Sequence, residues 1–74
     1  MNLSRRLSLR QLNVVVAVDQ YRSIMRAAQH LGLTQPTVTK ALQDAEASLS
    51  VALFHRTNRG VEPTPSGTAL ARHA

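Results

Sequence analysis

The stretch from residue 34 to residue 48, TQPTVTKALQDAEAS, has the side chains best suited to contacting a polyanion. Its beginning offers an amide, hydroxyls and one ammonium group, and its acidic residues come only later. Amide and ammonium groups donate hydrogen bonds, and hydroxyls both donate and accept them. These groups belong to Gln35, Thr37, Thr39 and Lys40. In isolation the same segment also fits a solvated surface face, so the surrounding elements must decide between the two interpretations.

This stretch is predicted to be a helix that begins after Thr34. Threonine is a good N-cap, and Pro36 falls in the first turn, where a missing N–H costs nothing because first-turn amides have no helical partner. Apolar residues recur at helical spacing on one face, at Val38, Leu42, Ala45 and Leu49. The polar groups of the first two turns are therefore expected to face outward.

A shorter helix is predicted just before it, from residue 24 to residue 31, with Ser23 as its N-cap. Small side chains let a neighbouring helix approach closely, and Gly32 ends the helix because glycine adopts the left-handed conformation at little cost. The positions expected to be buried are Ile24, Ala27, Ala28 and Leu31. An alanine pair, a glycine turn and an N-cap in this order predict a helix-turn-helix over residues 24–43.

A first helix is expected to precede this motif. Ser8 followed by Gln11 is a capping-box pattern, and Leu9, Leu12 and Val16 share one helical face. We expect that apolar face to mark how the helix packs.

A β-wing is predicted over residues 53–63, where two short extended pieces flank a basic turn. The turn contains Asn58, Arg59 and Gly60, so Arg59 is placed at the wing tip. Residues 8–64 are therefore predicted to form a mainly α-helical winged helix-turn-helix, with a three-helix core and a two-stranded wing.

Residues 1–7 contain two adjacent arginines and no periodic apolar pattern, so a flexible arm is expected there. At the other end, Thr64 caps a helix whose first residue is Pro65, and residues 65–74 are its beginning. Its apolar residues are expected to find no remaining core to cover, which favours packing on a second copy or continuation in a longer parent. These residues are Ala69, Leu70 and Ala74.

Size and charge narrow the class of function. The chain has 74 residues, no cysteine and a formal net charge of +5, which indicates an anionic partner such as nucleic acid or a membrane surface. The longest apolar run, residues 14–18, is far too short to span a membrane, so a cytoplasmic protein is expected. No nucleophile–base pair, carboxylate pair or phosphate-binding glycine loop indicates an enzyme, and the histidines are too scattered for a metal site.

With these elements in place, the sequence resembles the N-terminal DNA-binding domain of the LysR-type transcriptional regulators. Matching residues extend over nearly the whole chain. They are Arg26-Ala27-Ala28, Leu31, residues 34–40 (TQPTVTK), Glu46, Leu49, Leu53-Phe54, Arg56, Arg59, Thr64 and Gly67. Among the departures, Ala45 stands where the family usually has leucine and Ser50 where it usually has glycine, so stability is affected more than binding.

The resemblance implies a domain that binds double-stranded promoter DNA as a homodimer, joined through linker helices that begin at Pro65. A full-length parent can also assemble as a tetramer. No cofactor is expected in this domain, because in the family a small-molecule effector binds a larger C-terminal domain, which this chain does not include.

Roles can then be assigned by side-chain chemistry. Base edges are expected to be contacted by Gln35, Pro36, Thr37, Thr39 and Lys40. Phosphates are expected to be contacted by Arg10, Ser23, Arg26, Thr34 and Arg56. Arg59 is placed for a narrow minor groove. Arg10 and Arg26 fit equally well as ordinary surface cations, and a winged helix that binds only proteins is the chief alternative function.

Overall fold

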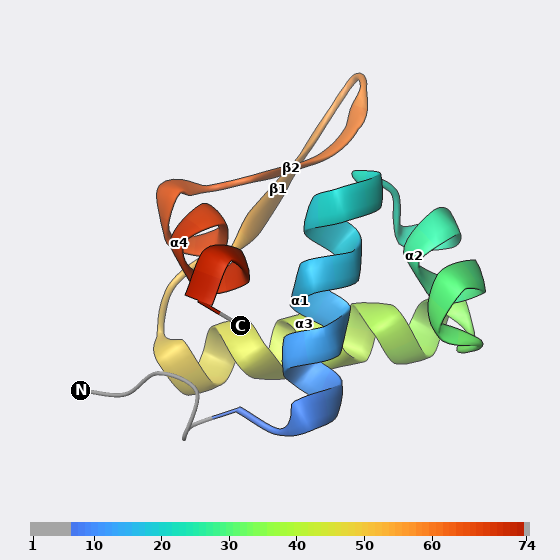
Figure 1. Cartoon of the computed structure of the whole chain (residues 1–74). Helices are drawn as coiled ribbons and strands as arrows, with labels where there is room; N and C mark the ends of the chain where they lie inside the picture. The colour runs from blue at the N-terminus through green and yellow to red at the C-terminus, as the bar shows by residue number, and fades with distance from the viewer. Residues whose placement is uncertain (1–6, 74) are drawn as a thin grey trace.

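The computed structural model describes residues 7–73, in which four helices and one two-stranded antiparallel sheet form the domain (Figure 1). The helices are α1 (Leu9–Tyr21), α2 (Ile24–Leu31), α3 (Gln35–Leu49) and α4 (Pro65–His73), and the strands are β1 (Phe54–Thr57) and β2 (Gly60–Pro63). This is the mainly α-helical winged helix-turn-helix predicted from the sequence. Within the described residues, no helix has both the length and the apolar character needed to cross a membrane.

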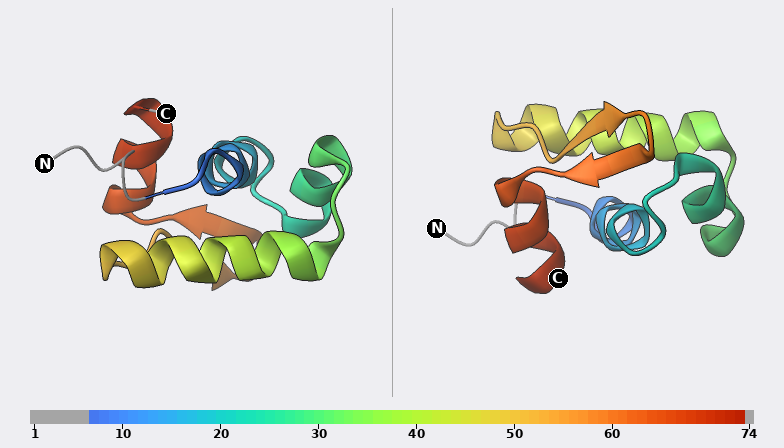
Figure 2. Two further views of the ribbon diagram at one scale, coloured as in Figure 1. Left: turned by 90° about the horizontal axis from the view of Figure 1, so that it is seen from below. Right: turned by 90° about the horizontal axis from the view of Figure 1, so that it is seen from above.

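Helix α1 is the centre of the fold, since it contacts α2, α3, α4 and β2. Figure 2 shows α1 nearly end-on, with α3 along one side and with α4 and α2 at its two flanks. The predicted capping box starts it: Ser8 Oγ accepts from the Gln11 amide at 3.1 Å, and the Gln11 side chain accepts from the Ser8 amide at 2.8 Å. The helix ends at Tyr21, and Arg22 follows in the left-handed conformation.

The apolar face predicted for α1 is not the face that the core covers. Leu9 is 74% exposed and Val16 is 38% exposed, and Leu12 is only partly buried. The buried residues of this helix are instead Val14, Val15, Ala17 and Val18. A helix with one covered side shows a single apolar stripe. Because α1 is covered from several sides, adjacent residues are buried together and the stripe is a poor guide.

The helix-turn-helix has the predicted caps. Ser23 Oγ accepts from the Arg26 amide at 3.2 Å and begins α2. Gly32 ends α2 at φ +70°, in the left-handed region. Thr34 Oγ1 accepts from the Thr37 amide at 3.3 Å and begins α3. The starts of α2 and α3 and the end of α2 are therefore each determined by one local residue, a side chain that caps the helix or a glycine that adopts the left-handed conformation.

The wing is an antiparallel hairpin whose register runs from the Phe54–Pro63 pair to the Thr57–Gly60 pair. Residues 58 and 59 form the turn, so Arg59 lies at the tip as predicted. The Arg59 amide donates to Thr57 Oγ1 at 3.2 Å, which ties the turn to β1. The hairpin extends away from the helices, as Figure 1 shows.

The base of the wing is anchored to two helices. Glu46 on α3 accepts hydrogen bonds through Oε2 from the amides of Leu53 at 2.7 Å and Phe54 at 3.3 Å. The Val61 amide donates to the Arg22 carbonyl at the end of α1, at 3.3 Å. Glu46 therefore has a structural role, because its carboxylate satisfies two amides where the chain leaves α3 for the wing.

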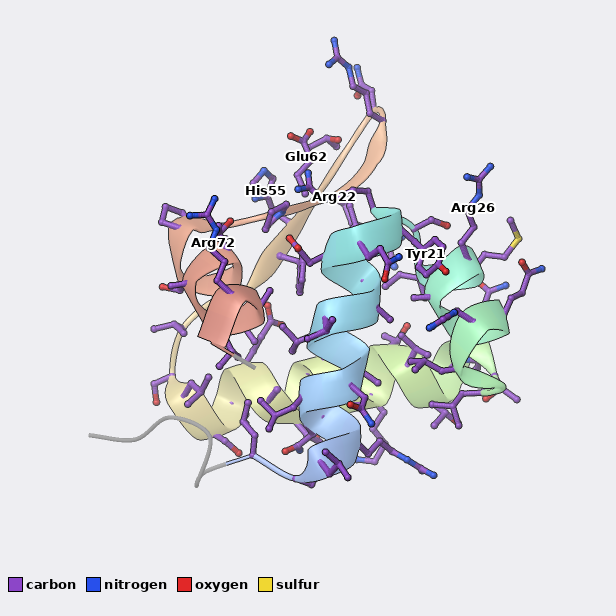
Figure 3. All side chains as sticks on the ribbon, in the orientation of Figure 1. Tyr21, Arg22, Arg26, His55, Glu62 and Arg72 are labelled. Carbon is purple, nitrogen blue, oxygen red and sulfur yellow. The ribbon has the colours of Figure 1, made fainter. Side chains whose placement is uncertain are left out.

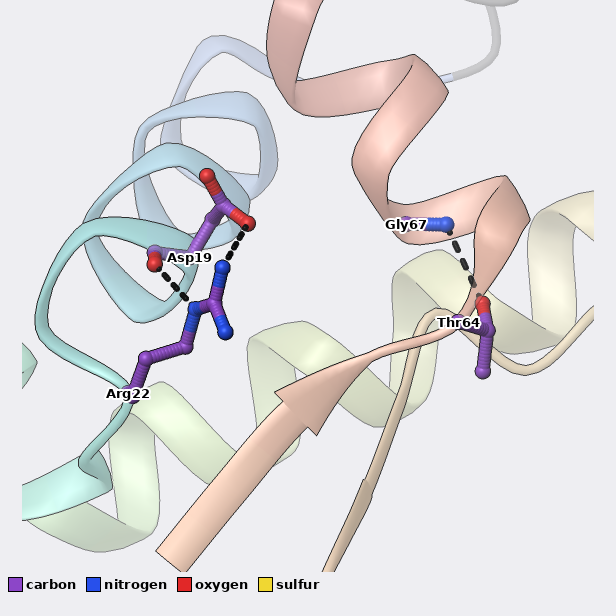
Figure 4. Close-up of polar contacts among 4 residues, drawn as sticks. All are labelled: Asp19, Arg22, Thr64 and Gly67. Atoms are coloured by element: carbon purple, nitrogen blue, oxygen red, sulfur yellow. Dashed lines mark hydrogen bonds and ion pairs between the residues drawn. The ribbon is translucent and has the colours of Figure 1, made fainter.

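Helix α4 begins with a cap that also joins it to the wing. Thr64 Oγ1 accepts from the Gly67 amide at 3.1 Å, as Figure 4 shows, and donates to the Ala52 carbonyl at 2.6 Å. At Gly67 any Cβ atom would overlap the Leu53 carbonyl. Glycine is therefore required there by close approach of the backbone and not by its own conformation.

Two expectations for the ends of the chain need correction. Leu70 on α4 is 3% exposed and lies in the core against α1, so α4 does have core to cover; Ala69 is exposed, and Ala74 lies outside the described residues. Leu7, the last residue of the predicted flexible arm, is 7% exposed and belongs to the core. Residues 1–6 lie outside the described residues.

Candidate nucleic-acid interface

The outward face of α3 lines a very shallow and widely open hollow. Its lining residues are Gln35, Pro36, Thr39, Lys40 and Gln43. The structure thus brings together four of the five residues predicted to contact bases. This set combines amide and hydroxyl groups with one ammonium on a single side of one helix, whose opposite side is buried.

Thr37, the fifth predicted base-contacting residue, does not line this surface. It is partly buried, and its Oγ1 lies 2.8 Å from Thr34 Oγ1 within the N-cap. The hydroxyls of both threonines are therefore engaged in beginning α3. Periodicity placed Thr37 on the outward face, but the cap draws its side chain toward the helix start.

A second hollow lies between α3 and the wing, and Figure 2 shows α3 running beside the two strands. Its lining residues are Ile24, Thr39, Leu42, Gln43, Glu46, Phe54, His55, Arg56 and Val61. Thr39 and Gln43 line both hollows, so the two surfaces are continuous. Arg56 is exposed and faces this second hollow, which places a cation from the wing next to the polar face of α3.

The other predicted cations are more widely spaced. Arg26 is exposed and projects from α2 into solvent, as Figure 3 shows, and Arg59 is exposed at the wing tip. Arg10 lies at the start of α1 in a separate hollow that Leu33 of the turn also lines. Ser23 and Thr34 occupy the N-caps of α2 and α3, so their positions coincide with two helix N-termini.

Two outward residues were missed as candidates from the sequence. Gln43 lies between the two hollows, one turn beyond Thr39, and its spacing of four residues from Thr39 was available as a signal. Asp44 forms an ion pair with Lys40, at 3.2 Å from Nζ to Oδ2 and 3.5 Å to Oδ1. Residues four apart are neighbours on a helix surface, so the spacing of this pair was also readable.

The described part of the chain places no three His, Asp or Glu side chains where they could hold an ion. The site instead consists of exposed hydrogen-bonding groups on one helix, flanked by cations on α2 and the wing. Together with the capped helix pair and the hairpin, these features define a winged helix-turn-helix domain. The second helix of its helix-turn-helix, α3, presents its polar face to solvent.

Comparison with known proteins places the domain more narrowly. The chain belongs to the lysR family of bacterial regulatory helix-turn-helix proteins, whose family model matches residues 9–68. Among curated relatives, the HTH-type transcriptional regulator GbpR of Azospirillum brasilense is 49% identical over 72 residues, covering 97% of this chain and 21% of GbpR. The chain therefore spans about a fifth of the length of this relative.

Solved structures agree in fold. The DNA-binding domain of CbnR, in a complex with DNA, superposes with a TM-score of 0.86 at 36% identity, covering 90% of this chain and 77% of that chain. The DNA-binding domain of BenM, in a complex with catB site 1 DNA, gives a TM-score of 0.86 at 33% identity, covering 90% of this chain and 75% of that chain.

Proposed function

We propose that this domain binds double-stranded DNA with sequence preference, as the DNA-reading part of a bacterial transcriptional regulator. Helix α3 enters the major groove, and the wing lies along the minor groove. The observation that carries the proposal is the outward face of α3, where Gln35, Thr39 and Lys40 line one surface next to Arg56 of the wing. The CbnR and BenM domains, solved in complexes with DNA, have the same fold.

On this proposal the outward face of α3 reads base edges. Gln35 pairs with the N6 and N7 atoms of an adenine, and Lys40 donates to the O6 or N7 atoms of a guanine. Pro36 and the Thr37 methyl group contact thymine methyls, while the Thr37 hydroxyl lies beside Thr34 in the N-cap of α3. Thr39, between the two hollows, bonds either a base or a phosphate.

Phosphate contacts set the register of the domain on the duplex and supply most of the affinity, because each neutralised phosphate releases counterions. The residues proposed for these contacts are Arg10, Ser23, Arg26, Thr34 and Arg56. Arg59 at the wing tip enters the minor groove, which attracts arginine most strongly where an A·T-rich segment narrows it.

We further propose that this domain acts in the cytoplasm as part of a homodimer joined through α4, and that in a longer parent chain such dimers form tetramers. The relative GbpR is about five times longer than this chain, which leaves room for a separate effector-binding domain. The exposed side of α4, which includes Ala69, is the surface proposed to face the second copy.

The test is a fluorescence anisotropy titration of the domain with duplexes selected from a random pool and with unselected duplexes, across salt concentrations. We expect selected duplexes to bind at least tenfold more tightly and to enrich a defined base pattern. A winged helix that serves only protein interaction predicts weak binding that is indifferent to sequence, and that result would refute the proposal.

A further inference from the structure

The ammonium of Lys40 does not stand alone on the outward face of α3. It lies 3.2 Å and 3.5 Å from the two carboxylate oxygens of Asp44, one turn further along the helix. Both side chains are well exposed, at 76% for Lys40 and 49% for Asp44. The residue proposed to read guanine is thus paired with a carboxylate on the same surface.

Helix stability gives little reason for this pair. An acidic residue four positions before a lysine is the more favourable orientation, and here the order is reversed. Exposed ion pairs of this kind contribute little to folding in any case. Stability therefore does not account for Asp44.

A carboxylate at position 44 is unfavourable for DNA binding in general, unless it has a specific role there. It is one of four acidic residues in a chain of net charge +5, and it lies one helical turn from residues proposed to enter the groove. A carboxylate near phosphates repels them and lowers affinity for every sequence. A purpose that offsets this loss must involve discrimination between sequences.

We propose that Asp44 is a positioning residue that holds the Lys40 ammonium over the base edges and away from the phosphates. This inference rests on the proposed function. An unpaired lysine is a flexible point charge that binds any nearby phosphate, so it adds affinity without discrimination. The pair converts Lys40 into a directed donor, and the domain loses non-specific affinity in exchange for base preference.

The experiment compares the wild-type domain with Asp44→Asn on selected and random duplexes, by anisotropy across salt concentrations. For random duplexes we expect binding about fivefold tighter at low salt, the effect of one unit charge about 4 Å from a phosphate in water. The slope of log K against log salt should steepen by about 0.9, as for one more neutralised phosphate. Selected duplexes should gain less, so that the ratio of specific to random affinity falls.

Three further variants separate positioning from general charge. Asp19→Asn makes the same change in net charge and also removes an ion pair, since Asp19 on α1 pairs at 3.7 Å with Arg22, which follows that helix (Figure 4). It should leave the ratio of specific to random affinity unchanged. Asp44→Glu restores a carboxylate within reach of Lys40 and should restore the ratio. In a Lys40→Met background, Asp44→Asn should no longer change the ratio or steepen the slope.

A fall in the ratio of specific to random affinity caused by Asp44→Asn in the Lys40→Met background would overturn the proposal, because Asp44 would then act without Lys40. Equal ratios for wild type and Asp44→Asn would also overturn it, provided that the wild type discriminates between duplexes. A wild-type domain that shows no preference would instead refute the proposed function, so the two failures are distinguishable.

Discussion

Single residues on the outward face of α3 and on the neighbouring wing are proposed to make two different kinds of DNA contact. Gln35 and Lys40 present groups that match particular base edges, whereas Arg56 on the wing presents charge to the backbone. All three border surfaces that are joined through Thr39 and Gln43. Their contributions should nevertheless separate in binding experiments, since base contacts act on selected sequences and phosphate contacts act on all of them.

Replacement of Lys40 or Gln35 by alanine should weaken binding to the preferred duplex by about 1 to 3 kcal/mol and relax the base preference at one position, because a bidentate or paired base contact is lost. Competition titrations with duplexes that carry each of the four base pairs at that position would measure this. Equal losses on preferred and random duplexes would contradict a base-reading role.

The Arg56→Ala variant should weaken all duplexes nearly alike and reduce the salt slope by about one unit, because one phosphate contact is removed. Arg72→Ala is a matched control with the same change of charge, on the exposed side of α4 (Figure 3). Both variants are measured on a single half-site, so that the proposed contact between two copies does not enter. It should shift binding much less. If the two variants behave alike, net charge and not position determines the effect.

At the ends of the helices, the residue type directly affects how easily the backbone adopts the conformation found there. Gly32 ends α2 at φ +70° and Ser50 ends α3 at φ +56°, both in the left-handed region. Only glycine adopts this region without steric cost, so the end of α3 is strained where the end of α2 is not.

Substitution Ser50→Gly should therefore raise the free energy of unfolding by about 1 kcal/mol, since it removes the penalty of a left-handed L-residue. Urea denaturation followed by circular dichroism would measure it. The reverse substitution, Gly32→Ser, should lower the free energy of unfolding by a similar amount, because it places an L-residue in the left-handed conformation. Nothing lies within 4 Å of an added Cβ atom at Gly32, so this variant tests the backbone conformation alone. An unchanged midpoint for Ser50→Gly would show that the strain is relieved elsewhere.

For the whole molecule, the symmetry of the proposed dimer determines the number and the spacing of the DNA half-sites that it can bind. A two-fold dimer presents its two recognition helices to half-sites separated by whole helical turns. Each domain carries a net charge of +5, so two copies on one face of the duplex also add their counterion release. The arrangement proposed for α4 thus has a geometric consequence that can be measured.

A dimer of this domain, held together by a parent linker or an added coiled coil, should bind two half-sites more tightly than one. An insertion of about 5 base pairs between the half-sites should abolish that gain, since it turns them to opposite faces of the duplex. An insertion of about 10 base pairs should preserve part of it. Footprinting on the three duplexes would measure the effect, and a gain independent of spacing would contradict paired binding.

The sequence alone determined the local features of this protein. Caps at Ser8, Ser23 and Thr34, the glycine turn at Gly32 and the basic turn of the wing were all predictable. Each depends on one residue and its near neighbours, so composition and spacing are enough to specify it. The outward face of α3 followed for the same reason, because a buried stripe on one side of a helix leaves the other side free.

Only the tertiary structure decided which surfaces meet. It showed that α1 is covered on several sides and that Leu70 belongs to the same core. It also joined the wing to α3 through Glu46. These contacts link residues distant in sequence, and a periodic pattern cannot say how many neighbours a helix will have. The approach of Arg56 to the polar face of α3 depends on them, so the proposed interface can form only in the folded domain.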